Sequence, residues 1–159
     1  MKKHAKLIYA GIVSLILVLS SFFVQICTVS GESMCPTFDA GNLLLMNKIS
    51  YEINRMDVVV IKKDGNLLIK RIVGLPGEDI KIENNKILIN QVQIEDIVNC
   101  ETDPGIAESG ISLKSGEYFV LGDNRNVSLD SRDERVGIIK ESEIVGKVVF
   151  SIFPLAPVK

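Results

Sequence analysis

Ser33 is the residue that raises the question of chemistry in this chain. It lies in residues 28–38, TVSGESMCPTF, between an acidic residue and a methionine, with a proline three residues on. A serine hydroxyl is a weak nucleophile until a neighbouring base takes its proton. The usual base is histidine, and the only histidine here is His4. Ser33 is therefore either a solvated loop serine or a nucleophile that has a different base.

A long apolar run ends shortly before Ser33. Residues 7–26, LIYAGIVSLILVLSSFFVQI, carry no charge, and a helix of about 20 residues crosses a bilayer core. The preceding MKKHAK holds three lysines, and positive residues favour the cytoplasmic side. We expect residues 1–6 in the cytoplasm, a transmembrane helix at residues 7–27 and a β-rich domain at residues 28–159 outside. His4 would then lie across the membrane from Ser33, which excludes a Ser-His-Asp triad outside.

A cleaved secretory signal is the alternative interpretation of the first thirty residues. Such signals have an apolar core of about 7–15 residues that ends in an A-x-A-like site. The apolar run here is longer, and no alanine follows it before Ala40. The length of the run favours an anchor that is retained.

Charge and cysteine usage exclude several other classes. Residues 28–159 carry 15 basic and 20 acidic residues, a balance that gives no support to nucleic-acid binding. Cys27, Cys35 and Cys100 form no C-x-x-C motif, so zinc and thioredoxin-like signatures are absent. Cys35 lies close to Ser33, but a cysteine nucleophile would need a nearby histidine. We expect the cysteines to behave as small apolar residues, and we expect no metal or cofactor.

Lys70 is the candidate base that remains, because burial can lower the pKa of a lysine until its amine is neutral. Residues two apart in a strand share a face. Lys70 would share its face with Leu68 and Ile72, while Arg71 would point the other way. Poor solvation between two aliphatic side chains would lower the pKa of Lys70. The alternative is a lysine whose stem lies on apolar surface while its amine reaches water.

The region beyond residue 27 has the pattern of short strands. Apolar runs bounded by turn residues predict strands at 42–48, 57–62, 66–73, 79–83, 86–90, 117–123 and 143–153. A D-G pair at 64–65 and an N-N pair at 84–85 predict two hairpins. Residues 90–115 are polar and weakly patterned, and we expect a small cap insertion there. The fold class is mainly β: a coiled β-sandwich or open-barrel catalytic domain with one N-terminal transmembrane helix.

Three segments carry a family resemblance. In order, SGESMCPTF (residues 30–38), IKRIVGLPGE (69–78) and GDNRNVSLDSR (122–132) resemble the three signature boxes of bacterial type I signal peptidases. These are membrane-bound serine proteases that use a Ser-Lys dyad. The boxes cover about a fifth of the chain, and together they are far more specific than any short motif alone. The N-terminal apolar run also matches the layout of that family.

The resemblance implies a role for each matching residue. Ser33 matches the nucleophile and Lys70 the general base, and the backbone N–H of Ser33 is the expected oxyanion donor. Ser128 would hydrogen-bond to the lysine amine and orient it. Asp130 and Arg132 would form a structural ion pair. The residues that would shape the site are Met34, Pro36, Gly122, Asp123 and Asn124.

Two positions depart from the pattern of the family. Some members carry a serine two residues before the nucleophile as a second oxyanion donor, and Gly31 stands there instead. Loss of one such donor costs about 2.7–4 kcal/mol in comparable sites. Asn42 replaces an aspartate that commonly follows the glycine, which affects only the expectation for a local turn.

The resemblance implies an endopeptidase that removes N-terminal signal peptides from exported pre-proteins at the outer membrane surface. Its partners would be secretory pre-proteins emerging from the translocation machinery, together with the lipid bilayer. The substrate backbone would pair with strand edges, and shallow apolar subsites would select small side chains at the first and third positions before the cut. The alternatives are a Ser-Lys protease of the repressor-autoprotease type and a membrane-tethered binding module without catalysis.

Overall fold

Two antiparallel sheets form the body of the molecule. The computed structural model describes residues 6, 9, 11, 12, 14, 23–49, 51–96, 98 and 102–158. The elements are β1 (Val24–Thr28), β2 (Leu43–Asn47), β3 (Val58–Lys63), β4 (Asn66–Gly74), β5 (Asp79–Glu83), β6 (Lys86–Ile89), β7 (Val92–Gln93), η1 (Gly105–Ser109), β8 (Ile111–Ser112), β9 (Glu117–Leu121), β10 (Ile139–Lys140), η2 (Glu141–Glu143), β11 (Ile144–Phe153) and β12 (Ala156–Pro157). The larger sheet has the order β1-β2-β11-β3-β4-β9-β10, with β12 beside β11, and the smaller has the order β7-β6-β5-β8.

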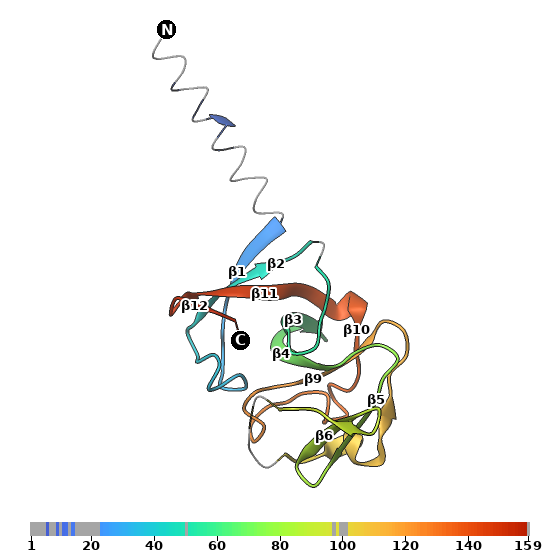
Figure 1. Ribbon diagram of the computed structural model, residues 1–159. Helices are drawn as coiled ribbons and strands as arrows, with labels where there is room; N and C mark the ends of the chain where they lie inside the picture. The colour runs from blue at the N-terminus through green and yellow to red at the C-terminus, as the bar shows by residue number, and fades with distance from the viewer. Residues whose placement is uncertain are drawn as a thin grey trace.

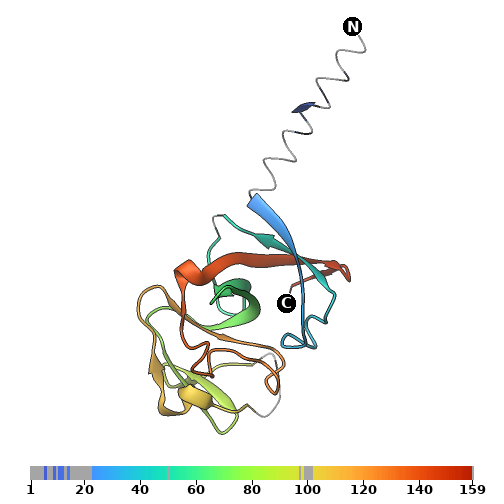
Figure 2. The same ribbon diagram turned by 180° about the vertical axis from the view of Figure 1, so that it is seen from behind.

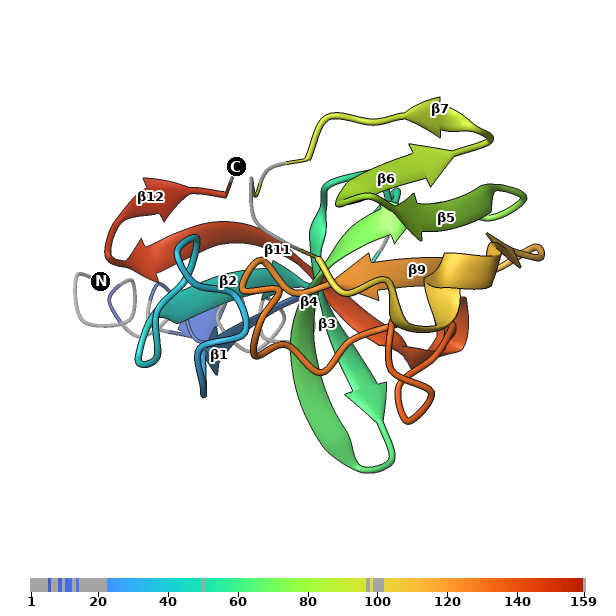
Figure 3. The ribbon, with the colours of Figure 1, turned by 90° about the horizontal axis from the view of Figure 1, so that it is seen from below.

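Strands β1 and β2 of the larger sheet lie at one end of the body, and the smaller sheet lies at the other. Figures 1 and 2 show, from opposite sides, β1 and β2 at one end and the smaller sheet at the other. Viewed from below, β4 and β9 of the larger sheet lie between these two ends (Figure 3). The mainly β fold predicted from the sequence is confirmed, and the seven predicted strands correspond to β2, β3, β4, β5, β6, β9 and β11.

Both predicted hairpins are present and have the turn chemistry that the sequence indicated. β3 and β4 pair up to Lys63 and Asn66, so the loop between them is the D-G pair. Asp64 and Gly65 both have positive φ, as the tight hairpin turn requires. β5 and β6 pair up to Glu83 and Lys86, and the two asparagines between them also have positive φ.

Three buried apolar clusters hold the sheets together, and β4 contributes to all of them. Ile72 belongs to a cluster with residues of β3 and β9. Val73 belongs to the cluster that joins the larger sheet to β5 and β6. Ile69 packs against a third cluster that contains Met34 and Phe38, from the loop after β1. The strand that carries Lys70 is therefore fixed at the centre of the molecule.

The polar segment at residues 90–115 contributes two short strands to the smaller sheet. β7 pairs with β6, and β8 pairs with β5. These two strands pair the free edges of the β5–β6 hairpin and so complete the smaller sheet, while the expectation of a small cap insertion stays a prediction.

The predicted transmembrane helix at residues 7–27 falls mostly outside the described residues. Its C-terminal boundary is wrong, because residues 24–27 lie in β1 and pair with β2, with Cys27 opposite Leu44. Among the described residues, no helix is long and apolar enough to cross a membrane. His4 and Cys100 also lie outside the described residues.

Candidate active site

The loop that carries Ser33 connects β1 to β2 and is anchored by its own apolar side chains. Its two ends are closed by a backbone hydrogen bond from the N–H of Val29 to the carbonyl of Asn42, at 2.9 Å. Met34 and Phe38 are almost fully buried in the neighbouring core cluster. Because Met34 follows Ser33 directly, its burial fixes the backbone at the serine.

Turn residues shape the rest of this loop. Gly31 has φ +99, a left-handed conformation that glycine adopts without strain. Pro36 lies inside the turn segment. Asn42 supports the turn that its identity had put in question, since its Oδ1 accepts a hydrogen bond from the N–H of Asp39 at 3.1 Å.

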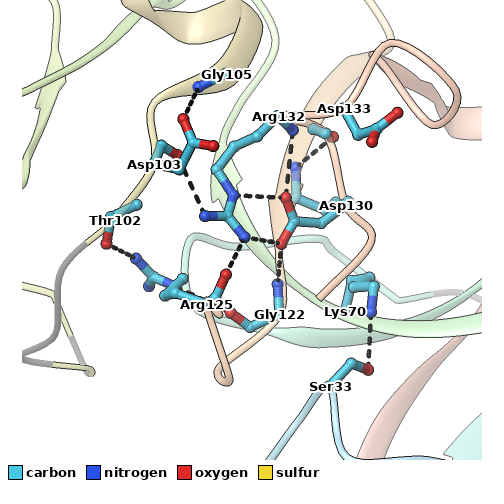
Figure 4. A network of polar contacts seen from close by, with 12 residues as sticks. Ser33, Lys70, Thr102, Asp103, Gly105, Gly122, Arg125, Asp130, Arg132 and Asp133 are labelled. Atoms are coloured by element: carbon cyan, nitrogen blue, oxygen red, sulfur yellow. Dashed lines mark hydrogen bonds and ion pairs between the residues drawn. The ribbon is translucent and has the colours of Figure 1, made fainter. Parts of the chain in front are cut away.

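Lys70 lies directly against Ser33. Its Nζ donates a hydrogen bond to Ser33 Oγ at 2.8 Å, as Figure 4 shows. The lysine is only 3% exposed, which excludes the alternative of an amine that reaches water. Burial lowers the pKa of Lys70 from 10.5 to about 8, opposed by the negative charge of Asp130 and assisted by the positive charge of Arg132. A large fraction of the amine is therefore neutral near pH 8.

The third box follows β9 and holds a buried ion pair (Figure 4). Arg132 Nε donates to Asp130 Oδ1 at 2.8 Å, and Arg132 Nη2 donates to Asp130 Oδ2 at 3.0 Å. The same Oδ2 accepts a hydrogen bond from the N–H of Gly122 at 3.0 Å. The ion pair thus fixes the backbone at the end of β9.

Gly122 brings this box into contact with the Ser33 loop. A Cβ placed on Gly122 would lie 2.5 Å from the carbonyl oxygen of Ser33 and 2.1 Å from Ser128 Oγ. No side chain fits there. The carbonyl of Ser33 also accepts a hydrogen bond from the N–H of Asn124 at 2.9 Å. The box therefore holds Ser33 through its backbone.

Ser128 does not make the hydrogen bond to Lys70 that the resemblance implied. Its Oγ is buried and has no hydrogen-bond partner within the part of the chain that the structure describes. The physical reason is its packing, because the hydroxyl lies against the Cα of Gly122. The role of Ser128 in orienting the lysine stays a prediction.

Arg71 and Asp123 form a second buried ion pair, which the sequence did not reveal. Arg71 Nε and Nη2 donate to the two oxygens of Asp123 at 2.8 and 2.6 Å, and Thr37 Oγ1 donates to the same carboxylate. Asp123 therefore links β4, the third box and the Ser33 loop. An arginine inside an apolar strand was a usable signal, because a buried charge requires a partner. The partner, 52 residues away, could not be named.

A cavity of about 210 Å³ lies beside Ser33 and Lys70. Its lining consists of Cys27, Thr28, Val29, Ser30, Ser33, Met34, Val60, Leu67, Leu68, Ile69 and Lys70. A larger cavity of about 590 Å³ is lined by residues within 103–106 and 125–135, most of them charged, and its lining includes neither Ser33 nor Lys70. The smaller, more apolar cavity is therefore the one next to the reactive pair.

Strand edges border this smaller cavity. β1 is the outermost strand of the larger sheet. β4 pairs with β9 only from Arg71 onward, so residues 66–70 present an edge with no strand beside it among the described elements. An extended peptide could pair with such an edge.

The cysteines in the described residues are poorly suited to nucleophilic attack. Cys27 and Cys35 are free thiols. Burial raises the pKa of Cys27, and the hydrogen bond from Cys35 to the carboxylate of Asp39 raises the pKa of Cys35. The thiol form is favoured at both positions, whereas the thiolate is the nucleophile. Within the described residues, no cluster of histidine, cysteine and carboxylate side chains could hold a metal ion.

Comparison with known proteins gives a consistent family. The model of the family described as signal peptidase, peptidase S26, matches residues 1–153. Signal peptidase I V of Bacillus subtilis is 39% identical, covering 87% of this chain and 93% of the relative. Signal peptidase I U of the same organism is 34% identical, covering 93% and 86%. A crystal structure of a signal peptidase I from Enterococcus faecalis is similar with a TM-score of 0.52 and 28% identity, covering 60% of this chain and 96% of that one.

Proposed function

Because the chain belongs to the signal peptidase family, peptidase S26, which consists of serine endopeptidases that act on secretory pre-proteins, we propose that Ser33 is its nucleophile and Lys70 its general base. The observation that carries the proposal is the 2.8 Å contact between Lys70 Nζ and Ser33 Oγ. It joins a hydroxyl to a lysine that burial makes easier to deprotonate. The family assignment, over residues 1–153, argues against the repressor-autoprotease alternative.

Ser33 and Lys70 supply the nucleophile and the base for acyl transfer. The neutral amine of Lys70 takes the proton of Ser33 Oγ as the oxygen attacks the carbonyl carbon of the scissile peptide bond. The resulting ammonium then gives a proton to the leaving amine, and the C–N bond breaks to leave an ester on Ser33. Water hydrolyses that ester, with Lys70 again as the base. Lys70 ends the cycle neutral, as it began.

The backbone N–H of Ser33 is the proposed oxyanion donor. It lies in a loop that the burial of Met34 and the hydrogen bond from Asn124 keep in place, and a preorganised donor stabilises the charge of the tetrahedral intermediate. Gly31 offers no side-chain donor, so Ser33 would carry more of this stabilisation than in relatives with a serine there.

The apolar cavity is the proposed site for the residues that precede the cut. Val29, Val60 and Ile69 are among the residues lining it, and its small size suits small side chains at the first and third positions before the cut. The free edges of β1 and residues 66–70 would pair with the extended substrate backbone.

Anchoring at the outer membrane surface is the proposed location. The support is the uncharged run at residues 7–26 after three lysines, of the length that spans a bilayer. The start of β1 at Val24 shortens the proposed span relative to our expectation. A signal peptide held in the same bilayer would present its cleavage site close to Ser33, which favours reaction through proximity.

Substitution of the two reactive residues in the full chain tests the catalytic proposal. Ser33→Ala should abolish cleavage of a secretory precursor, because the attacking atom is removed. Lys70→Arg should also be inactive, because a guanidinium cannot be deprotonated near neutral pH. Gel-based precursor cleavage measures both, and circular dichroism checks that both variants are folded.

Two matched variants control for this experiment. Cys35→Ala should keep most activity, because its thiol has no base, and Lys62→Arg should be nearly silent, because Lys62 is an exposed residue of β3. Substantial turnover by Lys70→Arg would show that the Ser33–Lys70 assignment is wrong.

A further inference from the structure

Arg125 is a buried arginine of the third box whose partner lies outside all three boxes. It is 5% exposed. Its Nη1 and Nη2 donate to the two carboxylate oxygens of Asp96 at 2.7 and 2.6 Å. Asp96 lies in the segment that follows β7, 29 residues away. This two-point geometry gives strong and directional charge-assisted hydrogen bonds, and a buried guanidinium without such a partner would be costly.

Arg125 Nη1 also donates to Thr102 Oγ1 at 3.4 Å (Figure 4), and the third nitrogen of the guanidinium reaches the backbone next to the active site. Its Nε donates to the carbonyl oxygen of Gly122 at 3.0 Å. The N–H of Gly122 donates in turn to Asp130. Two separate arginine–carboxylate pairs, Arg125 with Asp96 and Arg132 with Asp130, therefore hold Gly122 from its carbonyl side and from its amide side.

Gly122 is the point at which this network meets the reactive serine. Its Cα packs against the carbonyl of Ser33 and against Ser128 Oγ, with no room for a Cβ. A shift of Gly122 would displace Ser33 relative to Lys70, and small displacements of reacting groups have large effects on rate.

The third box also forms hydrogen bonds with Asp103 and Ile106, which follow Asp96 in the sequence. Arg132 Nη1 donates to the carbonyl of Asp103 at 3.2 Å, and the N–H of Ile106 donates to the carbonyl of Arg132 at 2.9 Å. Arg132 also donates to the backbone carbonyl of Arg125 at 2.8 Å, as Figure 4 shows. The two arginines are thus coupled to each other and to both ends of one segment.

We propose that Asp96 and Arg125 are a positioning pair that holds Gly122 against the Ser33 loop. A residue of the smaller-sheet region, outside the three boxes, then sets the geometry of the reactive serine. The inference deepens the proposed function and rests on Ser33 as the nucleophile. Neither residue lines the cavity beside Ser33, so the pair acts on the site through the backbone of the third box, chiefly at Gly122.

The test compares Asp96→Asn and Arg125→Met with the unchanged full chain in detergent, using cleavage of a secretory precursor. Asp96→Asn removes the charge and keeps the shape of the side chain. We expect kcat to fall by about tenfold to a hundredfold, the range that a misplacement of about 1 Å produces. KM should change little, because the cavity walls are untouched.

The pH profile supplies the readout that a purely structural role would not move. The charges of Asp130, Arg132 and Asp123 influence the pKa of Lys70. Asp130 also accepts the hydrogen bond from the N–H of Gly122. A loosened Gly122 would let the Ser33 loop shift away from Lys70 Nζ, which contacts Ser33 Oγ. Water would then reach the amine and weaken the desolvation that lowers the pKa of Lys70. The acidic limb of kcat/KM should therefore move to higher pH in Asp96→Asn.

Three further variants make the test selective. Asp133→Asn breaks an exposed two-point pair with Arg135 in the same loop and should leave kcat and the pH profile unchanged. Asp96→Glu keeps the carboxylate and should have a higher kcat than Asp96→Asn, though lower than that of the unchanged chain. The double variant Asp96→Asn with Arg125→Met should be no slower than Arg125→Met alone, because Asp96 acts through Arg125.

Each contrary outcome overturns the pair. The proposal is wrong if Asp96→Asn has the same kcat and the same pH profile as the unchanged chain. It is also wrong if the losses of kcat in the two single variants add up in the double variant. A loss of activity that follows a lowered melting temperature while the pH profile stays fixed would overturn it as well. If Lys70→Arg is inactive in the same assay, these outcomes leave the Ser33–Lys70 assignment standing. If Lys70→Arg is active, that assignment fails separately.

Discussion

The chemistry of Lys70 depends on its surroundings at the scale of single residues. A solvated lysine has a pKa near 10.4 and is almost wholly charged at pH 8. The 3% exposure of Lys70 removes that solvation, and its pKa falls to about 8. The fraction of neutral amine then rises most steeply with pH around pH 8.

We expect kcat/KM to rise with pH on the acidic side and to level off above an inflection at about 8, the pKa of Lys70 in the free enzyme. Only the neutral amine accepts the proton of Ser33, which sets the direction of the change. Initial rates of precursor cleavage between pH 6 and pH 10, at substrate concentrations below KM, give kcat/KM at each pH. A tenfold change in kcat/KM corresponds to roughly 1.4 kcal/mol in activation free energy. A profile that kept rising tenfold per pH unit up to pH 10 would indicate a solvated lysine instead.

The sequence predicted the reactive residues better than their supports. Strand periodicity left two interpretations of Lys70 open, a buried base and an amine that reaches water, and the structure shows that Lys70 is buried. Periodicity could not decide between them, because Arg71 on the opposite face is buried as well. Its contact with Ser33 could be predicted only through the family resemblance, since no local rule joins residues 37 apart. The ion pairs of Arg71 with Asp123 and of Arg125 with Asp96 were missed for the same reason. The hydrogen bond expected of Ser128 is absent because the hydroxyl packs against Gly122.

At the scale of elements, turn chemistry and apolar alternation predicted the strands with long hydrogen-bonded partners. β3, β4, β5 and β6 pair through two-residue turns that the D-G and N-N pairs identified. The two-residue strands β7, β8, β10 and β12 escaped prediction, because pairing with a neighbour creates them and their own sequence carries no alternation. β1 was hidden inside the apolar run that predicted a longer helix.

Gly122, at the junction of β9 and the third box, gives a prediction for this scale. We expect Gly122→Ala to reduce kcat strongly, because a Cβ would lie 2.5 Å from the carbonyl of Ser33 and would push the box away from the Ser33 loop. Gly146→Ala is the control. A Cβ there would lie 2.9 Å from the carbonyl of Asn47 and 2.9 Å from Met46 Sδ, both in β2, so its nearest neighbours include no residue of the third box.

The comparison uses kcat together with thermal unfolding, followed by circular dichroism. Gly146→Ala should lower the melting temperature while the folded fraction keeps its kcat, whereas Gly122→Ala should lose kcat even well below its melting temperature. Equal kcat in the two variants would refute the idea that Gly122 positions Ser33.

At the scale of the whole molecule, the site is built where the separate apolar clusters meet. β4 contributes a residue to each cluster on either side of Lys70, so the lysine cannot leave the interior without disturbing the core. The Ser33 loop is held against it by Met34 and Phe38. Placing a titratable amine in this position lowers stability whenever the amine is charged, because a buried charge is poorly solvated.

This opposition between stability and function gives the last prediction. The pKa of Lys70 is about 8 in the folded chain and near 10.4 when unfolded, so below pH 8 the folded state carries a charged amine at a cost of about 3 kcal/mol. Lys70→Met keeps the side-chain length and removes that cost. It also loses the hydrogen bond to Ser33, worth about 1 kcal/mol, which is smaller. At pH 7 the variant should therefore be inactive yet more stable than the unchanged chain.

The stability difference should shrink as the pH rises. The unfolded state of the unchanged chain binds more protons than its folded state between pH 8 and 10.4, so its free energy of unfolding increases across this window relative to that of the variant. Urea unfolding of both proteins at pH 7 and pH 10 measures the difference. A variant that is less stable at pH 7, or an advantage that does not shrink by pH 10, would show that Lys70 is solvated when charged.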